Sequence, residues 1–109
     1  MEKFNIVTLC GSTKFKDEFI KVAKDLTLDG MIVLTCCLFA QSGDKEALNL
    51  DTKGMLDIMH DQKIDMSDCI YVINPGGYIG ESTAREIIYA QMHDKKIEYL
   101  VEPENMIKQ

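Results

Sequence analysis

The sequence predicts an α/β fold: a doubly wound three-layer sandwich around a parallel sheet of four or five strands in the order 2-1-3-4. Short runs rich in apolar and β-branched residues alternate with segments of ten or more residues that show helical spacing, and this alternation is typical of βαβ units. The 109-residue chain has the length of one domain, so residues 1–109 are expected to form a single flavodoxin- or Rossmann-like unit.

The first βαβ unit is predicted in the N-terminal third of the chain. A short, mostly apolar strand at residues 4–9 is followed by the turn Cys10–Lys14. Apolar residues then recur at helical spacing; they are Phe15, Phe19, Val22, Ala23 and Leu26. Gly30 suits the end of this helix, and the second strand is predicted at residues 31–35.

The middle of the chain is harder to interpret. Residues 36–50 show no clear period; residues 41–44 have a loop composition, and residues 45–50 allow a short helical piece. A longer helix is predicted at residues 51–65. Its expected apolar side consists of Met55, Leu56, Met59 and Ile64.

A second pair of strands is predicted in the C-terminal half. The apolar run at residues 69–74 is the third strand, residues 82–93 form the third main helix, and residues 97–101 form the fourth strand. Pro103 ends this strand. Residues 104–109 are expected to be a short helix or a frayed end.

Composition and charge restrict the classes of partner. The net charge is −6 and the basic residues are scattered, so a nucleic-acid surface is not expected. No apolar run is long enough for a membrane span and no signal peptide is evident, which predicts a cytoplasmic protein without a membrane partner. The four cysteines lack zinc-site spacing, so we expect reduced thiols and neither a metal nor a cofactor.

Two unusual loops are expected to meet at one edge of the sheet. In doubly wound sheets, ligands bind beyond the carboxyl ends of the strands, where the strand order reverses. The loop at residues 10–14 contains Gly11-Ser12-Thr13, whose glycine, hydroxyls and backbone amides suit a phosphate. The alternative is a plain turn with Ser12 or Thr13 as an N-cap. Lys14 could supply a cation or be a solvated surface residue.

The second loop is rich in glycine. Gly76, Gly77 and Gly80 precede Ser82-Thr83 and the third helix. Three glycines exceed what a tight turn needs, which indicates close backbone packing or a loop that moves. Tyr78 lies among them, and it is expected either to line a pocket for a planar base or to seal the edge of the sheet.

Glu86 and His60 are the candidate titratable residues. Thr83 and Glu86 have the spacing of a capping box, and the alternative is that Glu86 is a carboxylate nucleophile near a helix N-terminus. His60, with Asp57 and Asp61 nearby, is either a satisfied boundary residue or a proton donor.

These features resemble the nucleoside 2-deoxyribosyltransferase family, which includes the 2'-deoxynucleoside 5'-phosphate N-hydrolases. Besides the order and length of the elements, four features carry the resemblance. They are Cys10-Gly11-Ser12 at the end of the first strand, Asp68 before the third strand, Glu86 with Ala90 four residues later, and Lys95-Lys96 before the fourth strand.

The resemblance implies cleavage or transfer of the N-glycosidic bond of a 2'-deoxynucleoside or its 5'-monophosphate, through a covalent intermediate on Glu86. It also implies a homodimer or higher homo-oligomer. The residues expected to bind this small-molecule nucleoside or nucleotide are Cys10, Gly11, Ser12, Thr13, Lys14, Gly77, Gly80, Ser82 and Thr83.

Two positions differ from the usual pattern of that family. Thr8 stands where the family has a tyrosine, and His60 stands where it has an aspartate on the second main helix. His60 and Tyr78 are therefore the candidate proton donors. The alternative function is a non-catalytic nucleotide-binding module, a sensor or a sequestering protein, on the same fold.

Overall fold

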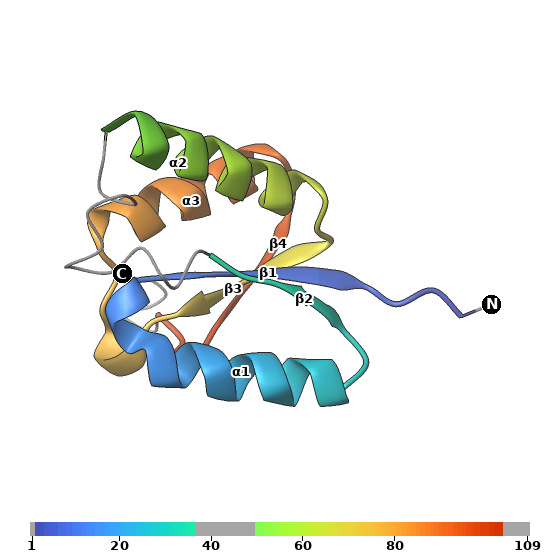
Figure 1. Cartoon of the computed structure of the whole chain (residues 1–109). Coiled ribbons are helices and arrows are strands. Elements are labelled where there is room, and N and C mark those ends of the chain that lie inside the picture. The colour runs from blue at the N-terminus through green and yellow to red at the C-terminus, as the bar shows by residue number, and fades with distance from the viewer. Residues whose placement is uncertain (1, 37–49, 104–109) are drawn as a thin grey trace.

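The computed structural model describes residues 2–36 and 50–103 (Figure 1). Seven main elements follow one another: β1 (Ile6–Gly11), α1 (Lys16–Leu28), β2 (Ile32–Leu34), α2 (Leu50–Asp65), β3 (Cys69–Ile73), α3 (Glu81–Met92) and β4 (Lys96–Tyr99). Two short 3₁₀ turns follow β1 and β3, at Thr13–Phe15 and Pro75–Gly77. The expectations for residues 41–44, 45–49 and 104–109 lie outside the described residues.

All strand pairs of the described sheet are parallel, and the strand order is β2-β1-β3-β4. The prediction of an α/β fold with strand order 2-1-3-4 is therefore confirmed, with four strands in the part of the chain that the structure describes. At the carboxyl end of the sheet, Gly11 of β1 pairs with Ile73 of β3.

The helices cover both faces of the sheet. Helix α1 lies on one face, whereas α2 and α3 lie together on the other (Figure 1). The core on the α1 side contains Leu9, Phe19, Val22 and Ile73. The core on the α2–α3 side contains Cys10, Ile64, Ile70, Val72, Ile87 and Ala90. Leu9 and Cys10 thus point to opposite faces, as neighbours in a strand must.

Strand β1 begins and ends two residues later than predicted. The Ile6 backbone N–H donates to Oδ2 of Asp68 at 2.8 Å, which ties the start of the strand to the segment before β3. Cys10 and Gly11 belong to the strand rather than to a turn. A Cβ atom on Gly11 would lie 2.7 Å from the carbonyl oxygen of Ile73, so this glycine permits the close approach of β1 and β3.

The predicted apolar side of α2 is wrong for Met55 and Met59, whose side chains are exposed. Ile64 is buried as predicted, at 0% exposed, and it shares the buried face of α2 with His60, which lies four residues earlier and is 6% exposed. Residues at this spacing share one face of a helix. The rotation of α2 about its axis thus places His60 against the sheet, where Met55 and Met59 were expected.

Candidate functional site

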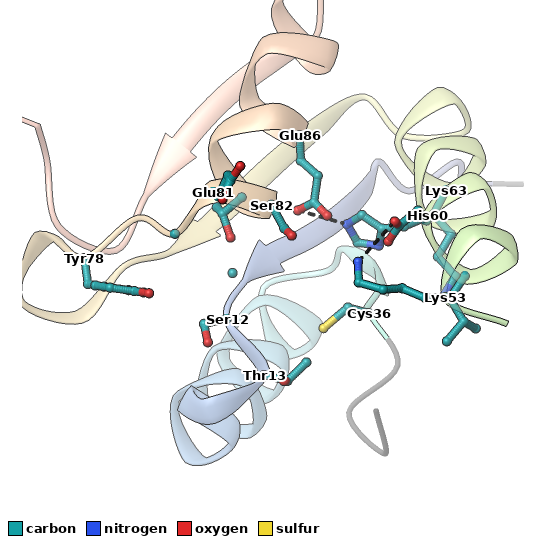
Figure 2. Close-up of a pocket in the computed structure, with 15 residues that line it drawn as sticks. Ser12, Thr13, Cys36, Lys53, His60, Lys63, Tyr78, Glu81, Ser82 and Glu86 are labelled. Carbon is teal, nitrogen blue, oxygen red and sulfur yellow. Dashed lines mark hydrogen bonds and ion pairs between the residues drawn. The ribbon is translucent and has the colours of Figure 1, made fainter. Parts of the chain in front are cut away.

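A cavity of about 360 Å³ lies beside the carboxyl ends of β1 and β3 (Figure 2), and its volume falls in the range of small-molecule sites. Its walls come from the loops after three strands, from α2 and from the start of α3. The lining residues are Gly11, Ser12, Thr13, Cys36, Lys53, Leu56, Asp57, His60, Lys63, Tyr78, Gly80, Glu81, Ser82, Thr83 and Glu86. The topology explains this position, because the connections leave opposite faces of the sheet where the strand order reverses.

Helix α3 begins at Glu81, with Gly80 as its N-cap and no side-chain cap hydrogen bond. The hypothesis of a capping box formed by Thr83 and Glu86 is therefore wrong. Thr83 lies inside the first turn and is 3% exposed. Glu86 lies in the second turn, too far along the helix to bind an uncapped amide. Its side chain points toward α2 instead (Figure 2).

Glu86, His60 and Cys10 form a compact polar cluster between α3, α2 and β1. The Oε1 atom of Glu86 lies 3.6 Å from Nε2 of His60, and these side chains are 13% and 7% exposed. The same Nε2 lies 3.4 Å from Sγ of Cys10. Cys10 is fully buried, so the thiol lies behind the two side chains that reach the cavity.

Burial moves the pKa values of this cluster toward the neutral forms. It raises the pKa of Glu86 from 4.5 to about 7, against the lowering effects of Arg85 and of a hydrogen bond with Cys10. Burial, with Lys63 second, lowers the pKa of His60 from 6.5 to about 4. His60 is therefore neutral at pH 7, so the contact with Glu86 is not that of two full charges.

The neighbours of His60 indicate where its proton lies. Within the described residues, Nδ1 of this imidazole is buried and has no hydrogen-bond partner. Its Nε2 faces both the thiol and the carboxyl group. A neutral imidazole carries one ring proton. The tautomer with this proton on Nε2 is favoured because, in the described part of the chain, only Nε2 faces groups that can accept a hydrogen bond. Cys10 holds its own proton, because burial and Glu86 raise its pKa well above the usual value.

Tyr78 lies at the mouth of the cavity and is 47% exposed. Its ring makes an edge contact with Phe15, with ring centroids 5.8 Å apart. Nζ of Lys14 lies 3.9 Å from the centroid of the Tyr78 ring, close enough for a cation–π interaction. The glycine-rich loop is thus joined to the loop after β1 through one aromatic side chain.

Thr8 does not line the cavity. It is fully buried, and its hydroxyl lies 2.6 Å from Oγ of Ser67 and donates to the carbonyl oxygen of Lys63 at 3.0 Å. The hydroxyl of Thr8 therefore connects β1 to the end of α2 and is not available to a ligand.

Most of the residues that the sequence singled out surround this cavity. Nine of the twelve line it: Gly11, Ser12, Thr13, His60, Tyr78, Gly80, Ser82, Thr83 and Glu86. Cys10, Lys14 and Gly77 do not. Cys10 contacts the lining residue His60 from its buried side, whereas Lys14 contacts the ring of the lining residue Tyr78.

Six lining residues were not predicted: Cys36, Lys53, Leu56, Asp57, Lys63 and Glu81. Helical spacing could have found those of α2, because Lys53 and Asp57 lie seven and three residues before His60 and so share its face. Nζ of Lys53 lies 3.4 Å from Oδ2 of Asp57. Cys36 follows β2 and carries no signal that distinguishes it from a core cysteine.

Comparisons of the chain with protein-family models, with curated proteins and with solved structures gave no match. Among residues 2–36 and 50–103, no helix is long and apolar enough to cross a membrane.

Proposed function

We propose that the protein cleaves or transfers the N-glycosidic bond of a 2'-deoxynucleoside or its 5'-monophosphate, with Glu86 as the nucleophile. One observation carries this proposal: Glu86 does not cap its helix, and its carboxyl group lies mostly buried in the wall of a cavity of about 360 Å³. A carboxylate held in this way at a ligand-sized cavity suits covalent catalysis at a sugar carbon. The resemblance of the sequence to nucleoside 2-deoxyribosyltransferases supports the same assignment.

The proposed reaction proceeds in two displacements. A carboxylate oxygen of Glu86 forms a bond to C1' of the sugar while the C1'–N bond breaks, and the base leaves with the electron pair and takes up a proton. Water or a second base then attacks C1' and releases Glu86. The attacking form is the carboxylate, which Arg85 and the thiol of Cys10 favour against the effect of burial.

His60 is assigned a positioning role. A pKa of about 4 leaves its imidazole neutral at pH 7, so it carries no extra proton for the departing base. Its Nε2 instead lies beside Oε1 of Glu86 at 3.6 Å and can orient the carboxylate. Tyr78 remains the candidate proton donor or stacking partner for the base, because its ring lies at the mouth of the cavity.

The start of α3 supports binding of a sugar or a 5'-phosphate. The backbone N–H groups of the first turn of a helix lack intrahelical partners, and no side chain caps them here. Ser82 and Thr83 of this turn line the cavity together with Ser12 and Thr13. These groups are suitable donors for an anionic oxygen.

A non-catalytic nucleotide-binding module, either a sensor or a sequestering protein, is the second candidate. It is favoured by Thr8 and His60, which replace the tyrosine and the aspartate of the related enzymes. The hydroxyl of Thr8 is already engaged by Ser67 and Lys63. This candidate uses the same cavity and predicts that the ligand is recovered unchanged.

The experiment that tests the proposal is a panel of 2'-deoxynucleosides and their 5'-monophosphates, with the released base separated by chromatography. We expect base release by the wild-type chain and none by Glu86→Gln, with unchanged circular dichroism. Glu98→Gln on β4 is the matched control and should retain activity. If no substrate loses its base but a nucleotide raises the melting temperature, the binding module is correct; if neither occurs, both candidates fail.

The homo-oligomer and the cytoplasmic location are retained as parts of this proposal. A second copy is supported by Ile88 and Met92 on α3, large apolar side chains that are 55% and 75% exposed. They lie one turn apart and so form a continuous strip.

A further inference from the structure

We infer that Cys10, His60 and Glu86 bind one divalent transition-metal ion, with Zn²⁺ as the best fit. The three side chains come from β1, α2 and α3. One potential ligand atom from each lies within 4.8 Å of the other two. This site was not expected from the sequence, because the spacing of the cysteines and histidines gives no zinc pattern.

The distances agree with those of a tetrahedral zinc site. Sγ of Cys10 lies 3.4 Å from Nε2 of His60, and that Nε2 lies 3.6 Å from Oε1 of Glu86. Usual Zn–S, Zn–N and Zn–O bond lengths at tetrahedral angles separate sulfur and nitrogen by about 3.6 Å and nitrogen and oxygen by about 3.4 Å. Both observed distances lie within about 0.2 Å of these values, and Sγ of Cys10 lies within 4.8 Å of the carboxylate oxygen of Glu86.

The chemistry of the donors selects the class of ion. A thiolate, an imidazole and a carboxylate form a mixed set that suits Zn²⁺, whereas Mg²⁺ and Ca²⁺ prefer oxygen ligands alone. Two anionic ligands also balance the charge of a divalent cation. Such an ion removes the cost of burying a thiolate and a carboxylate side by side, which in its absence favours their protonated forms.

The site would keep one coordination position open. Glu86 and His60 line the cavity, whereas Cys10 lies behind them. An ion held by these three groups therefore faces the cavity with its fourth position, which is the arrangement of an exchangeable rather than a closed structural site. Water or an anionic group of a ligand would complete the coordination.

Binding of the ion requires a definite change in protonation. The thiol of Cys10 loses its proton to solvent, as does the carboxyl group of Glu86 in those molecules where it is protonated. His60 would bind through Nε2 with its proton moved to Nδ1, which has no hydrogen-bond partner within the described residues. The present contacts of Nε2 with Cys10 and Glu86 would be replaced by bonds to the ion.

Metal binding does not depend on the proposed reaction, because it needs only the three ligands. A consequence for regulation does rest on the proposed function: an ion that occupies the electron pair of Glu86 would block its attack on C1'. Zn²⁺ would then act as an inhibitor of base release.

The test uses Co²⁺ as a spectroscopic probe of the full-length chain, stripped of metal and kept reduced with a phosphine. We expect one equivalent to bind, with visible bands of tetrahedral Co²⁺ and a near-ultraviolet band of thiolate-to-cobalt charge transfer, and Zn²⁺ should displace it. Cys10→Ser should abolish the charge-transfer band and weaken binding more than about tenfold. Cys69→Ser, which removes a buried thiol on β3 outside the cluster, should keep the band.

His60→Gln is a second ligand variant, should Cys10→Ser fail to fold, and it should weaken binding to a similar degree. Absence of Co²⁺ binding, or a charge-transfer band that persists in Cys10→Ser, would overturn the inference. Base release is measured in parallel with chelator and with Zn²⁺. If the ion binds but no base is released under either condition, the metal site is supported and the proposed function is refuted. If base is released but no ion binds, the proposed function is supported and the metal site is refuted.

Discussion

At the scale of single residues, Glu86 illustrates how position changes the chemistry of a carboxyl group. It lies five residues after the first residue of α3 and 13% of its side chain is exposed. Burial raises its pKa to about 7, because the charged form loses its hydration. A carboxyl group that is buried at this cost to stability is a candidate for a functional role.

Glu86→Gln should therefore stabilise the metal-free protein at high pH. The folded pKa of about 7 exceeds the ordinary value of 4.5, so the folded state binds the proton more tightly and loses stability as the pH rises from 4.5 through 7. Glutamine removes this loss, and we expect a gain of about 1–3 kcal/mol at pH 8 that falls to a small fraction of this value at pH 5. Urea denaturation in chelator at both pH values checks this, and an equal gain at both would contradict it.

Gly11 gives a second prediction at this scale. A Cβ atom there would lie 2.7 Å from the backbone oxygen of Ile73, which cannot move without separating β1 from β3. Gly11→Ala should destabilise the protein by about 1–3 kcal/mol, as measured by urea denaturation. Gly54→Ala is the matched control: nothing lies within 4 Å of the added atom on α2, so it should stabilise by about 0.4–1 kcal/mol. If Gly11→Ala does not lower the free energy of unfolding relative to Gly54→Ala, the argument is refuted.

At the scale of elements, the site depends on how α2 and α3 pack together. Arg85 donates to both carboxylate oxygens of Asp61, at 3.3 and 3.1 Å. About one turn farther along both helices, the hydroxyl of Tyr89 donates to Asp65 at 2.8 Å. These bonds join the same two helices as the contact between His60 and Glu86, so they restrain the relative rotation of α2 and α3.

The edge of the sheet depends on Asn74. This residue follows β3, is 1% exposed, donates from Nδ2 to the carbonyl of Val101 at 2.8 Å, and accepts from the Val101 N–H at 2.9 Å. Asn74→Ala should cost about 1–3 kcal/mol, because two part-buried hydrogen bonds to the backbone of Val101 are lost. Urea denaturation measures this cost. Asn74→Asp keeps only the acceptor, so its free energy of unfolding should lie between those of the wild-type chain and Asn74→Ala. A loss below about 0.5 kcal/mol would show that water replaces the side chain.

At the scale of the whole molecule, the layers leave apolar side chains exposed on α3. Ile88 is 55% exposed, and its burial against a second copy would remove this apolar surface from water. We expect a dimer by light scattering coupled to size exclusion, and Ile88→Lys should shift it to the monomer. Ile20→Lys is the control, since Ile20 has the same exposure but lies on α1, across the sheet. A monomeric wild-type chain, or a dimer that survives Ile88→Lys, would contradict this prediction.

The order of the elements could be predicted from the sequence because it depends on local periodicity. Apolar runs at residues 69–74 and spacing at Phe15, Phe19 and Val22 report strand and helix directly. The bounds of elements were less accurate, since the start of β1 depends on Asp68 and its end on pairing with β3. The apolar side of α2 was mispredicted at its two methionines, Met55 and Met59, which are exposed.

The sequence by itself determined that strands alternate with helices, that the sheet is parallel, and that two glycine-containing loops meet where the strand order reverses. Only the tertiary structure decided that α3 begins at Glu81, which excludes Glu86 as a cap, and that Glu86, His60 and Cys10 converge. The physical reason is that periodicity and turn chemistry act over a few residues. The contact between residues 50 positions apart depends instead on how α2 and α3 rotate and pack against β1.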